Sequence, residues 1–286
     1  CARSKTRQGQ YKMKIGIDMG GTNLRAALVD KHGIVRMEQV ASPAHGTEQE
    51  AIDVLCKLVE RLLSDGIDGI GAGIPSVIDR DNGIVYNAAN IPSWKEVHLK
   101  DILHKRFGMK IAIENDSNCF TLGVARYGDG QRFSNFVGTT LGTGLGGGII
   151  INHQLYGGVN GGAGEIGSLP YLDSDLEHYC SSMFFERVCH TTAERLYNRA
   201  VGGDAEAMEH WKEFGRHMGN MVKAVMFAYD PEAIIIGGGI SRAFALFAPS
   251  MRATVATFPY PKSVERLHIL PSTLKDAALL GAASLV

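Results

Sequence analysis

The sequence lacks several features that mark whole classes of proteins. No apolar run approaches the roughly 20 residues that a membrane-spanning helix needs, so we expect no membrane partner. Residues 1–12 are polar and contain no apolar core of a secretory signal. The net charge is -1, and only the short stretch at residues 3–7 is basic. These absences argue against a membrane protein, a secreted protein and a nucleic-acid-binding protein.

The cysteines do not form a disulfide framework. They occur at positions 1, 56, 119, 180 and 189, and no two have CxxC spacing. An odd number without framework spacing is typical of free thiols in a reducing compartment, which predicts a cytoplasmic protein. Residues 178–190 also contain two histidines and two cysteines, but only Cys189 and His190 are close, and they point apart on a helix. A metal site there is not favoured.

The chain is long and apolar enough for two domains. It has 286 residues, 45% of them hydrophobic, and its 35 glycines cluster after apolar strands. Short apolar runs at residues 14–18, 23–30 and 34–40 predict a hairpin meander. A helical stripe follows at residues 48–64, then strands at 69–75 and 111–113.

The same pattern restarts near residue 134. A strand, a glycine turn and a second strand occupy residues 135–152. A helix is predicted at 204–229 and a buried strand at 233–236. We therefore predict an α/β fold with two related domains facing each other across a cleft. We expect a disordered N-terminal extension at residues 1–12, a first domain at 13–125 joined by a C-terminal helix at 275–286, and a second domain at 126–274.

A carboxylate at a strand end is the most informative single feature. Asp116 follows the apolar strand at 109–113, within Glu-Asn-Asp-Ser-Asn. Asp and Asn also end strands for simple turn reasons, so the segment alone is a weak signal. A second such carboxylate, Asp18, opens a glycine turn, and two more glycine turns follow. One acid with three phosphate-sized turns indicates phosphoryl transfer to a hydroxyl, with Asp116 as general base.

The three glycine turns are candidate phosphate or nucleotide sites, because glycine lets backbone N–H groups approach an anion. Asp18 would repel phosphate unless a cation lay between them, which predicts Mg²⁺ held through water. Each turn could also be purely structural, and none has the common P-loop or dinucleotide pattern. The candidate cofactor-binding residues are Asp18, Gly20, Gly21, Thr22, Gly142, Thr143, Gly144, Gly237, Gly238 and Gly239.

Polar residues at loop positions could surround a sugar. Buried amides and carboxylates that pair with sugar hydroxyls discriminate well, because a wrong epimer leaves them unpaired. Taken alone, Glu177 reads more simply as a solvated acid at the start of a helix. The candidate substrate-binding residues are Asn90, Asn115, Asp116, Glu165 and Glu177.

Together these motifs resemble the ROK family of sugar kinases, in the actin-like ATPase superfamily. The resemblance runs from Met13 to the C-terminus and rests on five segments in order, at residues 16–22, 114–118, 141–148, 161–167 and 231–239. It implies two actin-like (ribonuclease H-like) domains, Asp116 as the base, and Glu165 and Glu177 as sugar ligands. It further implies ATP and Mg²⁺ as cofactors, a hexose as substrate and a homodimer.

The sequence departs from the family at one place. The family usually has a histidine after Gly-Glu-Ile-Gly and then a zinc-binding cysteine cluster, whereas this chain has Ser168 and no cysteine before Glu177. We therefore predict no structural zinc, and the sugar identity is left open. We expect an ATP-dependent hexose kinase acting on the 6-hydroxyl of glucose. Fructose, mannose, an N-acetylhexosamine, another phosphoryl donor, and a sugar-sensing regulator or assembly protein without kinase activity are the alternatives.

Overall fold

The computed structural model describes residues 12–286. The expected extension at residues 1–12 lies outside the described residues except for Lys12. The chain divides into two compact units, one reaching to Cys119 and including Asp276–Val286, the other spanning Phe120–Lys275. We call them the N-terminal and C-terminal units. The division falls inside α3 (Asp116–Tyr127), the same helix that contains the boundary expected after residue 125.

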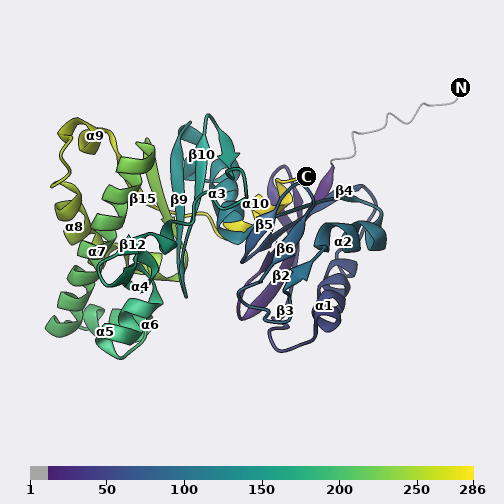
Figure 1. Cartoon of the computed structure of the whole chain (residues 1–286), viewed down its shortest axis with the longest axis horizontal. Helices are drawn as coiled ribbons and strands as arrows, with labels where there is room; N and C mark the ends of the chain where they lie inside the picture. Colours follow the sequence, from purple (N-terminus) through teal and green to yellow (C-terminus); the bar gives the residue numbers. More distant parts are fainter. Residues whose placement is uncertain (1–11) are drawn as a thin grey trace, which may run out of the picture. The chain divides into compact units, whose positions relative to one another are not determined.

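The N-terminal unit is built on a five-stranded sheet with the order β3-β2-β1-β4-β8 (Figure 1). The first three strands form the antiparallel meander expected from the sequence, and β4 and β8 run parallel to β1. The strands are β1 (Met13–Met19), β2 (Asn23–Asp30), β3 (Gly33–Ala41), β4 (Ile67–Ile74) and β8 (Lys110–Asn115).

Successive side chains of β1 point to opposite faces of this sheet, and the two faces pack against different helices. Ile15 and Ile17 lie in a core with residues of α1 (Glu48–Glu60) and α2 (Leu99–Phe107). Helix α1 begins at a capping box in which the Thr47 and Glu50 side chains satisfy each other's backbone N–H groups. It ends at Glu60, before the Ser64 end that the apolar stripe predicted.

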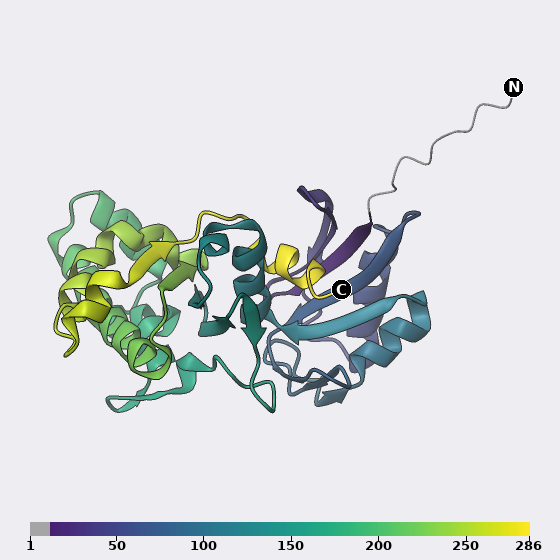
Figure 2. The same ribbon diagram turned by 90° about the horizontal axis from the view of Figure 1, so that it is seen from above.

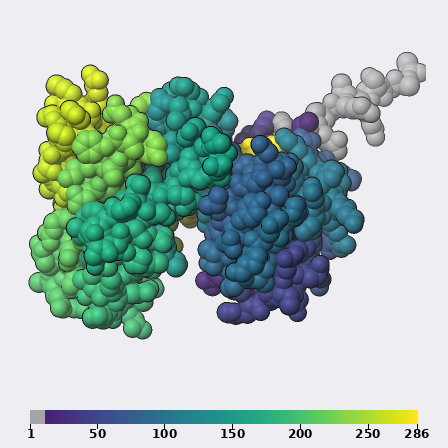
Figure 3. Space-filling view, in the orientation of Figure 1, coloured from purple at the N-terminus to yellow at the C-terminus, as the bar shows by residue number. Residues whose placement is uncertain are grey.

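The opposite face is covered by the last helix of the chain, α10 (Ala277–Ala283). This helix lies beside β1 and β4 in both ribbon views (Figures 1 and 2). Most of its residues are buried, and on the face shown in Figure 3 only a small yellow patch is visible among the purple and blue atoms. Close packing is possible because the strands present glycines. A Cβ at Gly16 would lie 2.1 Å from the Leu279 carbonyl oxygen, and one at Gly71 would lie 1.8 Å from that of Ala282.

A small three-stranded sheet follows β4 in the same unit. It consists of β5 (Val77–Asp79), β6 (Ile84–Tyr86) and β7 (Glu96–Val97), paired in chain order. The loop between β6 and β7 buries Ile91 and Trp94 completely. The sequence analysis missed this sheet, because strands of two or three residues are too short to show alternation. We call residues 76–97 the β5–β7 segment.

The C-terminal unit repeats the topology of the first sheet. Its strand order is β11-β10-β9-β14-β15, with β9, β10 and β11 antiparallel and β14 and β15 parallel to β9. This confirms the predicted α/β fold with two related domains. The strands are β9 (Phe136–Leu141), β10 (Leu145–Ile151), β11 (Gln154–Tyr156), β14 (Ala233–Gly237) and β15 (His268–Pro271).

Helices cover both faces of the second sheet. The long helix α7 packs its predicted apolar stripe, with Trp211 and Phe214, into a core that includes Val137 and Ile234. On the other face, α3 meets glycines, and a Cβ at Gly138 would lie 2.4 Å from Thr121 Oγ1. The remaining elements are β12 (Pro170–Tyr171), β13 (Ser174–Asp175), α4 (Leu176–Cys180), α5 (Ser182–Cys189), α6 (Ala193–Val201), α7 (Ala205–Tyr229), α8 (Phe244–Val255) and α9 (Pro261–Arg266).

The sequence analysis expected free cysteines and no membrane-spanning helix. Within residues 12–286 the cysteines Cys56, Cys119, Cys180 and Cys189 are free thiols. No helix in that range has both the length and the apolar character to cross a bilayer.

Candidate active site

Asp116 lies at the junction between β8 and α3. Its neighbour Asn115 caps the helix, because the Asn115 Oδ1 accepts the N–H groups of Ser117 (2.9 Å) and Asn118 (3.1 Å). The Asp116 carboxylate accepts the Ser117 N–H at 2.8 Å. A negative charge in the first turn of a helix interacts favourably with the helix dipole. The fold therefore holds Asp116 half-buried at the carboxyl end of a sheet strand.

Asp18 lies at the same edge of the sheet. It pairs in register with Gly73 of β4, which in turn pairs with Glu114 of β8. The thiol of Cys119 lies close to these acids. Burial raises the pKa of Cys119 well above its ordinary value, and the charges of Glu114, Asp116 and Asp18 add to the shift. The two strand-end carboxylates singled out in the sequence are therefore brought into one region of the N-terminal unit.

Arg25 is the direct partner of Asp18. The Arg25 guanidinium is 2.5 Å from Asp18 Oδ2 and 2.7 Å from Asp276 Oδ1, just before α10. Burial acts to lower the pKa of Arg25, but the two carboxylates outweigh it and raise that pKa. Sequence analysis missed this residue. The available signal was the hairpin itself, because Asp18 and Arg25 are directly opposite across its strands.

The first glycine turn meets Asn90 of the β5–β7 segment. A Cβ at Gly21 would lie 3.3 Å from the Asn90 side-chain carbonyl oxygen. Gly20 donates its N–H to the Asn23 carbonyl at 3.0 Å, which closes the turn, and Gly21 and Thr22 are exposed. Exposed backbone at the end of a buried strand is suited to contact an anion.

In the C-terminal unit, the second glycine turn meets Glu177 at the start of α4. Glu177 Oε2 accepts the Leu145 N–H at 2.9 Å, and a Cβ at Gly144 would lie 2.3 Å from the same oxygen. Ser182 donates its N–H to the Gly142 carbonyl at 2.9 Å. The short segment from Glu177 to Ser182 thus contacts the turn on two sides. Thr143, at the tip of the turn, stays exposed.

The third glycine turn lies against the second. Gly237 ends β14 in register with Thr140 of β9, and a Cβ at Gly238 would lie 2.3 Å from the Leu141 carbonyl oxygen. Gly238 has φ +84°, a conformation that favours glycine, and a Cβ added at Gly239 would have no neighbour within 4 Å. The C-terminal unit therefore gathers Gly142–Gly144, Gly237–Gly239 and Glu177 in one region.

Glu165 interacts electrostatically with Glu177. Glu165 is exposed as a residue, yet protein atoms around its carboxyl group partly bury that group. This burial raises the pKa of Glu165 above its ordinary value of 4.5, and the negative charge of Glu177 raises it further. Two acids held in this way can accept hydrogen bonds from neighbouring hydroxyl groups of one ligand.

The raised pKa predicts a pH-dependent stability change in the Glu165→Gln variant. Because the folded protein binds the proton more tightly than the unfolded chain, Glu165 destabilises the fold as pH rises from about 4.5 through the raised pKa. We expect Glu165→Gln to unfold at a higher temperature than the wild type at pH 7, with the difference fading at pH 4. Thermal unfolding at the two pH values measures it, and an equal difference at both would contradict the prediction.

The histidines and cysteines of residues 178–190, considered as metal ligands in the sequence analysis, have other surroundings. His178 Nδ1 is 2.7 Å from Asp175 Oδ1, and Cys180 is completely buried. Over residues 12–286, no three His, Cys, Asp or Glu side chains gather closely enough to hold a metal ion.

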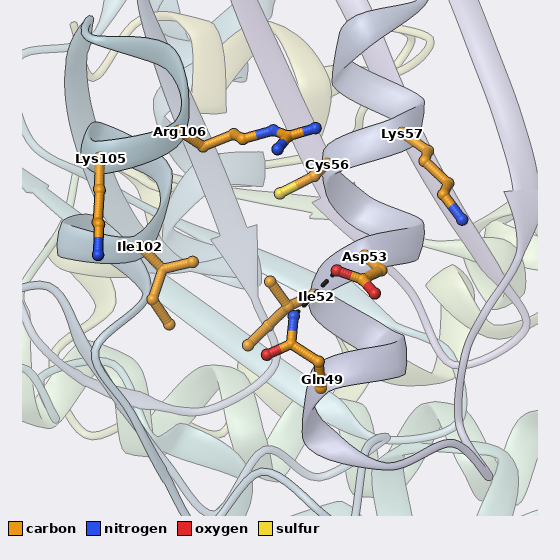
Figure 4. A pocket seen from close by; sticks show the side chains of 8 residues that line it. All are labelled: Gln49, Ile52, Asp53, Cys56, Lys57, Ile102, Lys105 and Arg106. Atoms are coloured by element: carbon orange, nitrogen blue, oxygen red, sulfur yellow. Dashed lines mark hydrogen bonds between the residues drawn. The ribbon is translucent and has the colours of Figure 1, made fainter.

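A pocket of about 360 Å³ lies away from these residues, between α1 and α2 (Figure 4). Arg106 and Cys56 point toward each other across it, and Gln49 donates a hydrogen bond to Asp53 at 2.9 Å. Arg106 is itself paired with Glu60 at 2.5 Å. None of the predicted site residues lines this pocket, so it is not part of the candidate active site.

Known proteins match this chain over most of its length. The sequence matches the ROK family over residues 14–286. It is 31% identical to a glucokinase of Thermotoga maritima, covering 95% of this chain and 96% of the relative. It is 25% identical to a xylose repressor of Bacillus subtilis, covering 95% of this chain and 76% of that protein.

A solved structure is similar over almost the whole chain. It is a ROK family glucokinase from Streptomyces griseus in complex with glucose and AMPPNP, with a TM-score of 0.82 and 28% identity. The alignment covers 96% of this chain and 99% of the other. The two-unit fold and these relatives define a sugar kinase. The chain belongs to the ROK family, which confirms the resemblance found in the sequence.

Proposed function

We propose that this protein transfers the terminal phosphoryl group of ATP to the 6-hydroxyl of a hexose, with glucose as the first candidate. The supporting observation is the position of Asp116, held by Asn115 and Ser117 at the start of α3 and at the same sheet edge as Asp18. Similarity to a glucokinase in complex with glucose and AMPPNP supports the same choice of substrates.

In this proposal Asp116 is the general base. It takes the proton of the 6-hydroxyl while the oxygen attacks the γ-phosphorus and the bond to the leaving ADP oxygen breaks. Such a base contributes about 10²–10⁴-fold to the rate, and the rest comes from positioning and charge neutralisation. Asn90, Asn115, Glu165 and Glu177 would orient the sugar through its other hydroxyls. The glycine turns would hold the phosphates and adenosine with backbone N–H groups.

The residues around Asp18 fit a magnesium ion held through water. Asp18 is a largely buried oxygen donor at a strand end, and Arg25 fixes its orientation. Magnesium in phosphoryl-transfer sites usually has one or two protein carboxylates and completes its coordination with water and phosphate oxygens. When bound, the ion would neutralise charge on the phosphates. Asp18 itself would orient the water molecules between them.

A sugar-sensing regulator without kinase activity is the second candidate, favoured by the similarity to a xylose repressor. The retained Asp116 favours catalysis, because a protein that only binds sugar does not need a base. The two candidates differ in a simple observable. A kinase releases ADP in proportion to the sugar consumed, whereas a regulator binds the sugar and leaves ATP intact.

A coupled assay over a panel of sugars tests the proposal. Glucose, fructose, mannose and N-acetylhexosamines would be supplied with Mg-ATP, and with polyphosphate as the alternative donor. We expect sugar-dependent ADP release with the highest kcat/KM for glucose, and a 6-phosphate product by NMR. Sugar binding without turnover of any donor would overturn the kinase proposal. Light scattering of the same preparation tests the proposed homodimer, and elemental analysis tests the proposed absence of zinc.

A further inference from the structure

A completely buried acid lies directly before the proposed base. Glu114 is 1% exposed, and its Oε1 accepts the Asn115 N–H at 2.8 Å and the Asn118 Nδ2 at 3.0 Å. Its Oε2 lies 2.6 Å from the Nε of Arg80, an ion-pair distance, and has no hydrogen-bond partner among the described residues. A buried carboxylate is costly unless it is paired and hydrogen-bonded, and this one is both. Glu114 is therefore held by partners on two sides.

Arg80 belongs to a different element from Glu114. It directly follows β5, in the β5–β7 segment, and its side chain is 35% exposed. The same segment is tied to the end of β8 at a second point, because Asn115 Nδ2 donates to the Ser76 carbonyl at 3.2 Å. Ser76 Oγ in turn donates to the Tyr86 carbonyl of β6. The ion pair thus connects the segment that carries Asn90 to the end of β8, where Asn115 ends the strand and Asp116 begins α3.

We propose that Arg80 and Glu114 are a positioning pair for the sugar site. The inference rests on the proposed function and extends it to residues that touch no substrate. On one side, Glu114 fixes Asn115 and Asn118, and so the start of α3. On the other, Arg80 fixes the β5–β7 segment, and with it Asn90 beside Gly21. The pair sets the spacing between two groups of sugar-contacting side chains, so its loss weakens sugar binding more than nucleotide binding.

Glu114→Gln and Arg80→Met separate this role from a general loss of structure. Gln keeps an oxygen that can accept the Asn115 and Asn118 hydrogen bonds, and it replaces the charged oxygen that faces Arg80 with an amide NH2 that cannot pair with a guanidinium. Met keeps the length of the Arg stem and removes the guanidinium. We expect the KM for the sugar to rise about tenfold or more in Arg80→Met, with the KM for ATP within about threefold of wild type. Calorimetry with sugar alone should show the same loss.

A double-mutant cycle and a conservative variant complete the test. Arg80→Met leaves a buried charge unpaired, so adding Glu114→Gln should recover part of the lost sugar affinity. Arg80→Lys should recover part of it by restoring a cation. Arg106→Met is the matched control, because it removes another Arg–Glu ion pair of this unit, at the exposed end of α2. It should leave both KM values unchanged.

The outcomes are distinguishable. Two results would overturn the proposed role of the pair. One is wild-type sugar affinity in Arg80→Met, and the other is additive effects of Arg80→Met and Glu114→Gln on sugar affinity in the double-mutant cycle. An equal rise of both KM values together with a lowered unfolding temperature would also overturn it, because that pattern reports general destabilisation. Failure of the proposed function shows separately, as sugar binding without phosphoryl transfer in the wild type. In that case calorimetry on the same variants still measures the effect of the pair on sugar binding.

Discussion

The Asp116→Asn variant is expected to lose kcat by at least about a hundredfold while it still binds sugar. Asn has the same shape and keeps an oxygen that can accept the Ser117 N–H, so the start of α3 should be preserved. The amide cannot take the proton of the attacking hydroxyl. The loss should therefore appear in kcat, because the missing step occurs only in the transition state.

Steady-state kinetics and calorimetry together check this expectation. The coupled assay gives kcat and KM, and calorimetry gives the sugar Kd without nucleotide. Ser117→Ala is a matched control, since it removes a neighbouring hydroxyl that lies 3.5 Å from the Asp116 carboxylate and keeps the backbone N–H. We expect it to keep most of the wild-type kcat. Turnover close to wild type in Asp116→Asn would remove the base assignment. A hundredfold weaker sugar Kd would instead make Asp116 mainly a sugar ligand.

Much of the candidate site could be predicted because it lies at the ends of buried strands. The apolar run at 109–113 ends at Asp116, and the run at 14–18 ends at Asp18. In a sheet with β1, β4 and β8 parallel, such ends meet at one edge. The family resemblance added Glu165 and Glu177. The hydrogen bond from Leu145 to Glu177 could not be predicted, because its donor is a backbone N–H group, which carries no sequence signal.

The ion pair between Arg80 and Glu114 shows where sequence reasoning ends. Glu114 was part of a recognised segment, but its side chain could have faced either side of β8. Arg80 lies in a turn after a three-residue strand, where neither helical nor strand periodicity applies. Their contact depends on how the β5–β7 segment folds back onto the main sheet, which is a tertiary feature. The same limit applies to Asn90, whose neighbour Gly21 is distant in the chain.

The two sheets share one further feature, a face of glycines that meets a helix. In the C-terminal unit Gly138 and Gly237 meet Thr121 and Phe120 of α3. In the N-terminal unit Gly16 and Gly71 meet α10. A strand without Cβ atoms lets a helix backbone approach closely, so the pattern explains why glycines interrupt otherwise apolar strands. The sequence revealed these glycines but not their partners.

This packing predicts a large loss of stability in the Gly71→Ala variant. The added Cβ would lie 1.8 Å from the Ala282 carbonyl oxygen, so β4 or α10 must move. Both are backbone, which cannot rotate away as a side chain can, and the residues of α10 from Leu279 to Ala283 are buried. Overpacking typically costs 1–3 kcal/mol. Because displacement of α10 also exposes an apolar face, we expect about 3 kcal/mol or more in the free energy of unfolding.

Denaturant unfolding of Gly71→Ala and of a matched control decides this prediction. Gly46→Ala places a methyl group in the same unit at ordinary contact, 3.4 Å from the Glu50 Cβ, and should change the unfolding free energy by no more than about 0.5 kcal/mol. Limited proteolysis supplies a second readout, because a displaced α10 exposes the C-terminal residues to carboxypeptidase. A Gly71→Ala protein that unfolds like Gly46→Ala and resists digestion would show that β4 and α10 are not packed this closely.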